Sequence, residues 1–117
     1  MVKKPNCAVA VLAAGMLSSP LVLAGQGQGQ VERGQKLFVE QKCSVCHSIA
    51  GKGNPKGALD EIGAKLKSDE IREWIVNAPE MAKKIKAERK PPMRGYASLS
   101  KEDVDGLVAY LSTLKKK

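Results

Sequence analysis

Histidine and cysteine are scarce in this chain of 117 residues. His47 is the only histidine, and Cys7, Cys43 and Cys46 are the only cysteines. A structural zinc site takes four tetrahedral ligands, and beyond its N-terminal segment the chain offers only Cys43, Cys46 and His47. A histidine ligand directly after a cysteine ligand is also awkward around one small ion. These absences argue against structural zinc.

Aromatic residues and strand patterns are rare as well. Phe38, Trp74, Tyr96 and Tyr110 are the complete aromatic set, and we find no convincing β-strand. Because a thioredoxin-like dithiol needs a βαβ pattern around it, the cysteines do not fit that chemistry. The length allows one small domain, which buries only a limited core unaided. The composition therefore fits a fold whose interior is completed by a bound apolar group.

The stretch Cys43-Ser44-Val45-Cys46-His47 indicates which apolar group is bound. It reads C-x-x-C-H, which is the attachment site of a c-type haem. Two thiols on one turn can form thioether bonds to the two haem vinyl groups. His47 then points its imidazole at the iron from the proximal side. We therefore predict one covalent haem c with its iron, attached through Cys43 and Cys46 and ligated by His47.

The N-terminal segment is similar to a secretory signal. Lys3 and Lys4 precede an apolar run, and Val22-Leu23-Ala24 suits a small-residue cleavage site. We predict a signal peptide at residues 1–24 and a periplasmic location. An uncleaved anchor is the alternative, because residues 7–24 approach the length that spans a bilayer.

Two further segments complete the predicted organisation. Residues 25–30 alternate glycine and glutamine, which indicates a flexible polar lead-in. Residues 31–117 then form a single domain with no internal repeat. The formal charge is +8, and removal of Lys3 and Lys4 leaves +6. This charge favours an acidic protein face or an anionic membrane as partner. Export argues against nucleic acid, and we do not expect membrane association.

Helical patterns occur in four places. The last is the clearest, because Ser100 suits an N-cap and an apolar stripe follows it. The first predicted helix runs from about Val31 to Lys42, and the second is capped by Ser68 and stops near Asn77. A short third helix is opened by Pro79. The last helix carries its apolar stripe on one face: Val104, Leu107, Val108, Leu111 and Leu114. Basic residues gather after Pro79, at Lys83, Lys84, Lys86, Arg89 and Lys90, and suit a solvated face or a docking surface.

The loop after the haem motif is dense in glycine and proline and can wrap the proximal edge of a haem. A proximal histidine usually donates its second ring nitrogen to a backbone carbonyl, and the carbonyl of Pro55 is the candidate. Leu59 is expected to pack on the macrocycle. Trp74 can pack there too or reach a propionate with its indole N–H, and a plain core role is its alternative.

Together these features resemble the monohaem class I cytochromes c. The resemblance covers residues 34–114 and rests on the haem motif and on five accompanying features: Gly34 and Phe38, Trp74-Ile75, Asn77 with Pro79, Pro91-Pro92-Met93, and Tyr110-Leu111. It implies an all-α bundle of about four to five helices around one covalent haem. The first and last helices cross in that fold, so Gly34 and Phe38 would meet Tyr110.

The resemblance also implies that Met93 is the distal iron ligand. With one histidine, two-histidine ligation within a molecule is impossible, and Met1 and Met16 leave with the signal. Met81 lies four residues from Ile85, where a core-filling role is expected. Met93 instead follows Pro91-Pro92, whose fixed φ angles stiffen its backbone.

The function implied is that of an exported one-electron carrier, not an enzyme. We expect a monomer that exchanges electrons with redox proteins through their acidic docking faces. One alternative is a haem-bearing subunit docked on a larger oxidoreductase. Another is a small haem peroxidase or gas sensor with a labile sixth ligand. The sequence names neither donor nor acceptor.

Overall fold

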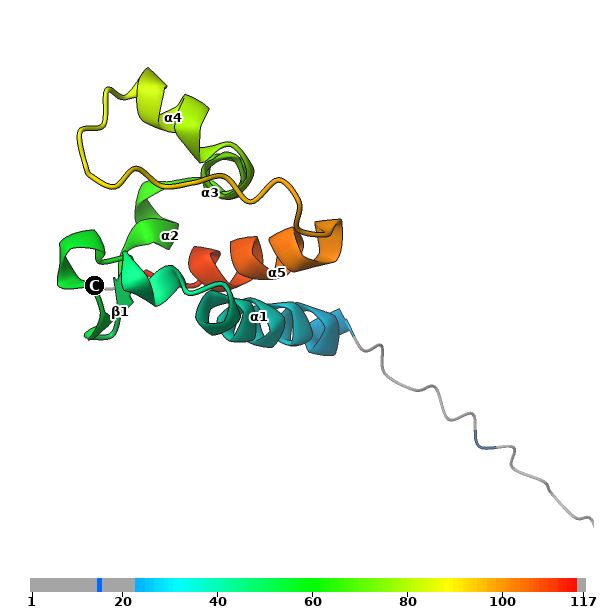
Figure 1. Ribbon diagram of the computed structural model, residues 1–117. Coiled ribbons are helices and arrows are strands. Elements are labelled where there is room, and N and C mark those ends of the chain that lie inside the picture. The colour runs from blue at the N-terminus through cyan, green and yellow to red at the C-terminus, as the bar shows by residue number, and fades with distance from the viewer. Residues whose placement is uncertain (1–14, 16–22, 116–117) are drawn as a thin grey trace, which may run out of the picture.

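The computed structural model describes Gly15 and residues 23–115 of the chain (Figure 1). Its five α-helices are α1 (Leu23–Glu40), α2 (Ile62–Lys65), α3 (Ser68–Val76), α4 (Ala78–Lys84) and α5 (Lys101–Ser112). Two 3-10 turns, η1 (Cys43–Val45) and η2 (Pro55–Gly57), flank a hairpin of β1 (Ser48–Ile49) and β2 (Lys52–Gly53). The all-α prediction of four to five helices is confirmed. The small hairpin, with two residues in each strand, was not expected.

Helices α1 and α5 lie side by side and cross at a pair of glycines (Figure 1). A Cβ atom on Gly34 would collide with the carbonyl of Gly106 and lie 2.7 Å from Cβ of Tyr110. The rings of Phe38 and Tyr110 pack edge to face, with centroids 6.2 Å apart. The predicted meeting of Gly34 and Phe38 with Tyr110 is confirmed. Gly106 was missed, although a glycine inside an apolar helical stripe signals close packing.

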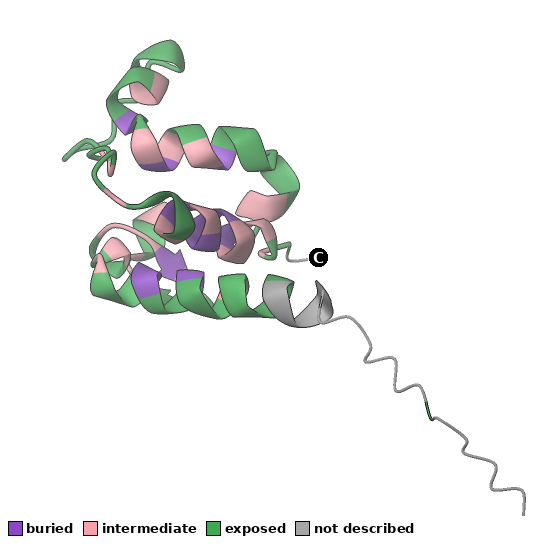
Figure 2. Cartoon of the chain, turned by 90° about the vertical axis from the view of Figure 1, so that its right-hand side faces the viewer, coloured by how far each residue is buried: buried purple, intermediate pink, exposed green. Residues whose placement is uncertain are grey.

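The core lies among α1, α3 and α5 (Figure 2). Its buried members are Leu37, Phe38, Ile71, Ile75, Val104, Leu107, Val108 and Leu111. Four residues of the stripe predicted for the last helix are among them, and the fifth, Leu114, is half-buried beyond the helix end. The predicted cap is confirmed, because Oγ of Ser100 accepts a hydrogen bond of 3.1 Å from the backbone N–H of Asp103.

Ion pairs connect the same three helices at their exposed margins. Arg33 of α1 reaches Asp103 at 2.7 Å, and Arg72 of α3 reaches Asp105 at 2.6 Å. Hydrogen bonds from Lys101 and Arg72 lower the pKa of the Asp105 carboxyl. Solvent screens such exposed pairs, so their contribution to stability is small. The helix arrangement therefore depends mainly on the packing of the core.

The predicted helix boundaries need two corrections. Helix α1 begins at Leu23, not near Val31, so residues 25–30 are helical and not a flexible lead-in. Glutamine is a good helix former, and each residue that extends a helix adds a hydrogen bond. The helix ends at Glu40, and Lys42 adopts a left-handed φ of 58°.

At the start of α3 the cap lies one residue earlier than predicted. Lys67 occupies the N-cap and Ser68 is the first helical residue. The Glu70 carboxylate accepts a hydrogen bond of 3.1 Å from the Lys67 backbone N–H. Glu70 is the third helical residue counted from Lys67, and its bond to the Lys67 N–H is the reciprocal bond of a capping box, which favours Lys67 as the cap.

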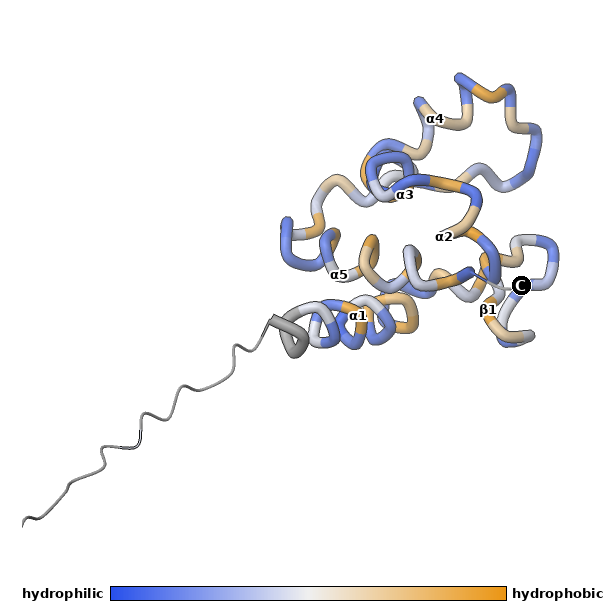
Figure 3. Tube along the Cα trace, turned by 180° about the vertical axis from the view of Figure 1, so that it is seen from behind, coloured by the Kyte–Doolittle hydropathy of each residue, from blue (hydrophilic) through white to orange (hydrophobic). Residues whose placement is uncertain are grey.

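Helix α4 and the segment after it lie on the far side of α3 from α1 (Figure 1). This region is mostly hydrophilic (Figure 3), and the basic residues from Lys83 to Lys90 are exposed. The predicted Met81–Ile85 core pair is wrong, because α4 ends at Lys84 and Ile85 is 62% exposed. Ile85 is the C-cap residue and its N–H still donates to the Met81 carbonyl at 3.2 Å, but no element of the described chain covers the face on which its side chain lies.

The predicted signal peptide at residues 1–24, Cys7 included, lies almost entirely outside the described residues. Within the described part of the chain, no helix combines the length and the apolar character needed to cross a membrane.

Candidate haem-binding site

The haem motif forms one compact turn directly after α1. The backbone N–H groups of Cys46 and His47 both donate to the carbonyl of Cys43, at 3.1 and 2.9 Å. Cys43 and Cys46 are half-buried free thiols, and Val45 between them is 67% exposed. Burial is the main reason why the pKa of the Cys43 thiol is raised. Two thiols on one turn are thus available for covalent attachment.

His47 is oriented by a hydrogen bond of 3.0 Å between its Nδ1 and the carbonyl of Gly57. Since a carbonyl only accepts, Nδ1 carries the proton and Nε2 is left for a metal. The pKa of His47 is lowered, mainly by burial and also by the charge of Arg89, while the bond to Gly57 opposes this. The neutral imidazole that iron ligation requires is therefore favoured.

The prediction that Pro55 supplies this carbonyl is wrong. Asn54 caps η2 by accepting a 3.0 Å hydrogen bond from the Lys56 backbone N–H, which places Pro55 at the beginning of the turn. The carbonyl that reaches the His47 ring belongs to Gly57, the last residue of η2. The predicted carbonyl lies two residues too early in the same 3-10 turn. The glycine and proline content of a loop predicts a turn but not which of its carbonyls faces the histidine.

Gly57 and Asn54 are functional candidates that sequence reasoning treated only as loop residues. A Cβ atom on Gly57 would collide with the carbonyl of Cys46 and lie 2.9 Å from Nδ1 of His47. The Asn54 side chain donates to the Val45 carbonyl at 3.2 Å, and its backbone N–H donates to Ser44 at 3.1 Å. The loop therefore contacts the backbone of the motif, and the absence of a side chain at Gly57 allows the closest of these contacts.

The other predicted site residues lie in different elements of the chain. Leu59 follows η2, packs against the core and donates its N–H to the Ser48 carbonyl at 2.8 Å. Trp74 of α3, Met81 of α4 and Met93 in the segment before α5 are half-buried and outside the cluster of buried core residues. Partly covered indole and thioether groups of this kind suit an apolar cofactor edge better than a filled core.

The segment that carries Met93 is docked on the end of α3. The backbone N–H of Tyr96 donates to the carbonyl of Ile75 at 2.7 Å, and a Cβ on Gly95 would lie 2.8 Å from the carbonyl of Val76. The guanidinium of Arg94 lies 5.1 Å from the centre of the Tyr96 ring. These contacts fix the chain directly after Met93.

The residues of the motif fit a haem better than a bare metal ion. Within the described part of the chain, no three side chains of His, Cys, Asp or Glu converge as a metal site. Cys43, Cys46 and His47 do not form such a group either. Separate thiols and a singly oriented imidazole are the donor set that a covalent haem uses.

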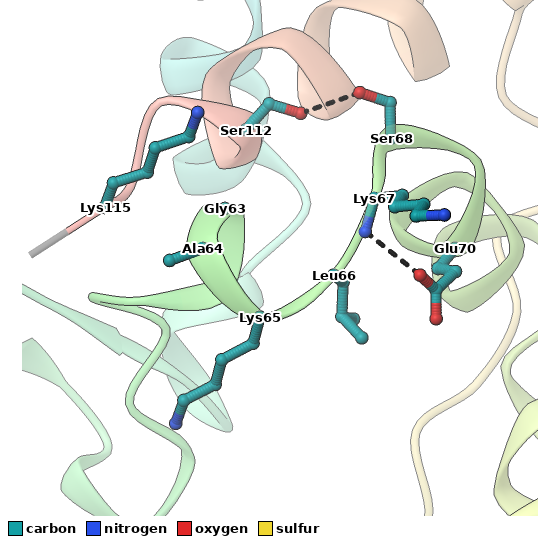
Figure 4. Close-up of a pocket in the computed structure, with 9 residues that line it drawn as sticks. All are labelled: Gly63, Ala64, Lys65, Leu66, Lys67, Ser68, Glu70, Ser112 and Lys115. Carbon is teal, nitrogen blue, oxygen red and sulfur yellow. Dashed lines mark hydrogen bonds between the residues drawn. The ribbon is translucent and has the colours of Figure 1, made fainter.

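A separate open pocket of about 500 Å³ lies between α2, the start of α3 and the end of α5 (Figure 4). Lys65, Lys67 and Lys115 line it, together with Ser68 and Ser112, whose hydroxyl oxygens are 3.3 Å apart. None of the predicted haem residues lines this pocket. The pocket is therefore distinct from the haem-binding turn.

Comparisons with known proteins identify the family of the chain. The sequence profile of the family described as Cytochrome c matches residues 31–115. The chain is similar to "Cytochrome c oxidase subunit 2" of Alkalihalophilus pseudofirmus, with 30% identity over 91 residues that cover 71% of this chain and 25% of that protein. It thus spans about a quarter of the length of that relative. No solved structure matches it significantly. The chain belongs to the cytochrome c family, which implies covalently bound haem c with its iron.

Proposed function

We propose that this protein is an exported one-electron carrier in which Cys43 and Cys46 hold the haem and His47 and Met93 ligate its iron. The observation that carries the proposal is the compact turn with two free thiols, next to an imidazole whose Nδ1 is held by Gly57. When bound, the haem supplies an iron that alternates between its ferric and ferrous states. The protein contributes ligation, burial and docking.

The partner of His47 and the second ligand have separate roles in this proposal. The carbonyl of Gly57 holds the proton on Nδ1 of His47 and so directs Nε2 at the iron. The thioether of Met93 would be the second protein ligand of the iron, and a thioether ligand raises the reduction potential. With His47 and Met93 both as ligands, the protein would leave no open position for a substrate, which would suit electron transfer. We therefore propose that the protein is not an enzyme.

Met93 is the better distal candidate because of its backbone. Pro91 and Pro92 restrict the chain before it, and the hydrogen bond from Tyr96 to Ile75 fixes the chain after it. Met81 remains a rival, because its expected core partner Ile85 is exposed. A direct comparison of the two methionines is therefore required.

The proposed location and partners are supported by the sequence and by the exposed charge. The signal-like segment at residues 1–24 supports export to the periplasm. The exposed lysines from Lys83 to Lys90 support transient docking on acidic faces of redox proteins. We propose that the carrier works as a monomer.

A second candidate function is that of a haem-bearing subunit docked on a larger oxidoreductase. It is favoured by the similarity to a relative described as an oxidase subunit, of which this chain matches about a quarter. Co-purification of the protein with a membrane oxidoreductase in a fixed ratio would support it. A peroxidase or gas sensor would instead bind carbon monoxide or cyanide in its native state.

Covalent attachment is tested on the matured protein. The bound pigment should survive acid–acetone extraction and stay with the polypeptide on denaturing gels. Replacement of both thiols, Cys43→Ala with Cys46→Ala, should abolish this retention, whereas the matched change Ser44→Ala in the same turn should preserve it. Haem that extracts freely from the matured protein would contradict the proposal.

A further inference from the structure

The segment between α4 and Tyr96 has few backbone ties. After the hydrogen bond from the N–H of Ala87 to the carbonyl of Ala82, at 2.9 Å, the next backbone bond along the chain is that of Tyr96 to Ile75. Within the described residues no backbone hydrogen bond is donated by the chain from 88 to 95. Figure 1 shows this stretch as a long loop that runs from α4 back toward α5. Met93 lies within it.

Arg89 provides a tie from this stretch to the haem motif. Its guanidinium donates a hydrogen bond to the carbonyl of Cys46, 43 residues away in sequence. Its other terminal nitrogen lies beside Gly57, in the space that a Cβ atom on that glycine would occupy. The missing side chain at Gly57 thus makes room for both Arg89 and the Cys46 carbonyl.

The charge of Arg89 is directed at this contact. Among the described residues Arg89 forms no ion pair with a carboxylate, unlike Lys83, which reaches Glu80 at 3.2 Å. A hydrogen bond from a charged donor is stronger than one between neutral groups, and a guanidinium presents several donors in a rigid fork. A lysine at this position would keep the charge but lose the fork.

We propose that Arg89 is a positioning residue that straps the Met93 segment to the haem motif and thereby keeps the thioether on the iron. The inference rests on the proposed ligation by His47 and Met93. Arg89 lies four residues before Met93, and Tyr96 lies three residues after it. The guanidinium of Arg89 binds the carbonyl of Cys46, next to His47, and the backbone of Arg89 belongs to the chain just ahead of Met93. Release of Arg89 would leave the ligand segment attached only at Tyr96 and at the end of α4.

The test uses the full-length ferric holoprotein at neutral pH, with Arg89→Gln, Arg89→Lys and, as a matched control, Lys90→Gln. The control removes the same charge one residue away, from a side chain that makes no hydrogen bond or ion pair with any of the described residues. The rate of cyanide binding reports opening of the distal position. In a denaturant titration, the far-red sulfur-to-iron band reports the Met93 bond and far-UV circular dichroism reports the helices.

Loss of the strap should raise the cyanide-binding rate of Arg89→Gln about tenfold, the scale expected for losing one charge-assisted hydrogen bond. Its far-red band should disappear at a lower denaturant concentration than its helical signal. Arg89→Lys should bind cyanide at a rate between those of wild type and Arg89→Gln. Lys90→Gln should match the wild type in both measurements.

Four results would overturn the strap. Equal cyanide-binding rates and equal band stability in Arg89→Gln and Lys90→Gln would show that the contact of Arg89 with Cys46 does not hold the Met93 segment. Wild-type behaviour of Arg89→Lys would show that charge alone acts, and a parallel loss of band and helical signal in Arg89→Gln would show a general folding role. A wild type that lacks the band and binds cyanide as fast as Met93→Ala would refute the ligation proposal itself, and the strap with it.

Discussion

The α1–α5 crossing and the segment from Ile85 to Gly95 are held in place by different means. At the crossing, Gly34 and Gly106 bring two backbones into contact, and Phe38 and Tyr110 pack beside them. The segment is mostly exposed and is held by Arg89 and by the docking of Tyr96. The haem-attaching turn follows directly from the end of α1, whereas Met93 lies in the loosely held segment. Changes in the two regions should therefore have separable effects on folding and on distal ligation.

The largest loss of stability is expected at the crossing. In Gly34→Ala the new methyl group would collide with the Gly106 carbonyl, and because backbone cannot move aside cheaply, α1 and α5 would have to separate. Overpacking of this kind costs about 1–3 kcal/mol, occasionally more. The free energy of unfolding from denaturant titration of the holoprotein measures it.

Gly29→Ala is the matched control in the same helix. A Cβ atom there meets no atom within 4 Å, so the change should be neutral or should stabilise the protein by up to about 1 kcal/mol through helix propensity. Equal unfolding free energies for Gly34→Ala and the wild type would show that the two helices are not in close contact.

A second change separates the proximal side from the fold. In Gly57→Ala the methyl group would press on the Cys46 carbonyl, on Nδ1 of His47 and on the guanidinium of Arg89, so the ring should lose its orientation. We expect a smaller fraction of low-spin ferric protein in the absorption spectrum and a shifted reduction potential, with the helical content retained. Loss of a partner that orients a metal-bound histidine typically costs about 10–100-fold in affinity or activity.

Pro55→Ala serves as the control for Gly57→Ala. It leaves the hydrogen bond from His47 to Gly57 in place and removes only the rigidity of proline, an effect of about 0.4–1 kcal/mol on stability. Should Pro55→Ala change the ferric spectrum as strongly as Gly57→Ala, the assignment of the Gly57 carbonyl would be wrong.

The smallest effect is expected from the exposed lysines. Electron transfer to an acidic partner should slow as salt rises, because exposed charges are screened beyond roughly 10 Å at about 0.1 M ionic strength. Stopped-flow kinetics over a salt series measures this, and Lys84→Gln should reduce the slope without changing the reduction potential. A rate independent of salt with the physiological partner would argue against electrostatic docking.

Local features of the fold could be predicted from the sequence. The Ser100 cap and the apolar stripe of the last helix depend on residues within a few positions of each other, and the structure contains both. The meeting of Phe38 with Tyr110 came from the resemblance to a family. The residues of the haem motif are brought into one turn, as their spacing predicts.

Features that depend on exact chain geometry could not be predicted in this way. The partner of His47 is Gly57 and not Pro55, because the phase of η2 is set by the Asn54 cap. Gly106 is opposite Gly34 only because of the angle at which two helices cross. The tie from Arg89 to Cys46 joins residues far apart in sequence, for which no local pattern exists.

Replacement of each candidate thioether in turn tests the proposed ligation by His47 and Met93 most directly. In Met93→Ala the ferric far-red sulfur-to-iron band should vanish, the reduction potential should fall, and cyanide or carbon monoxide should bind. Met81→Leu, which conserves volume in α4, should leave all three nearly unchanged. Loss of the band in Met81→Leu with its retention in Met93→Ala would contradict the proposal and place the distal ligand in α4.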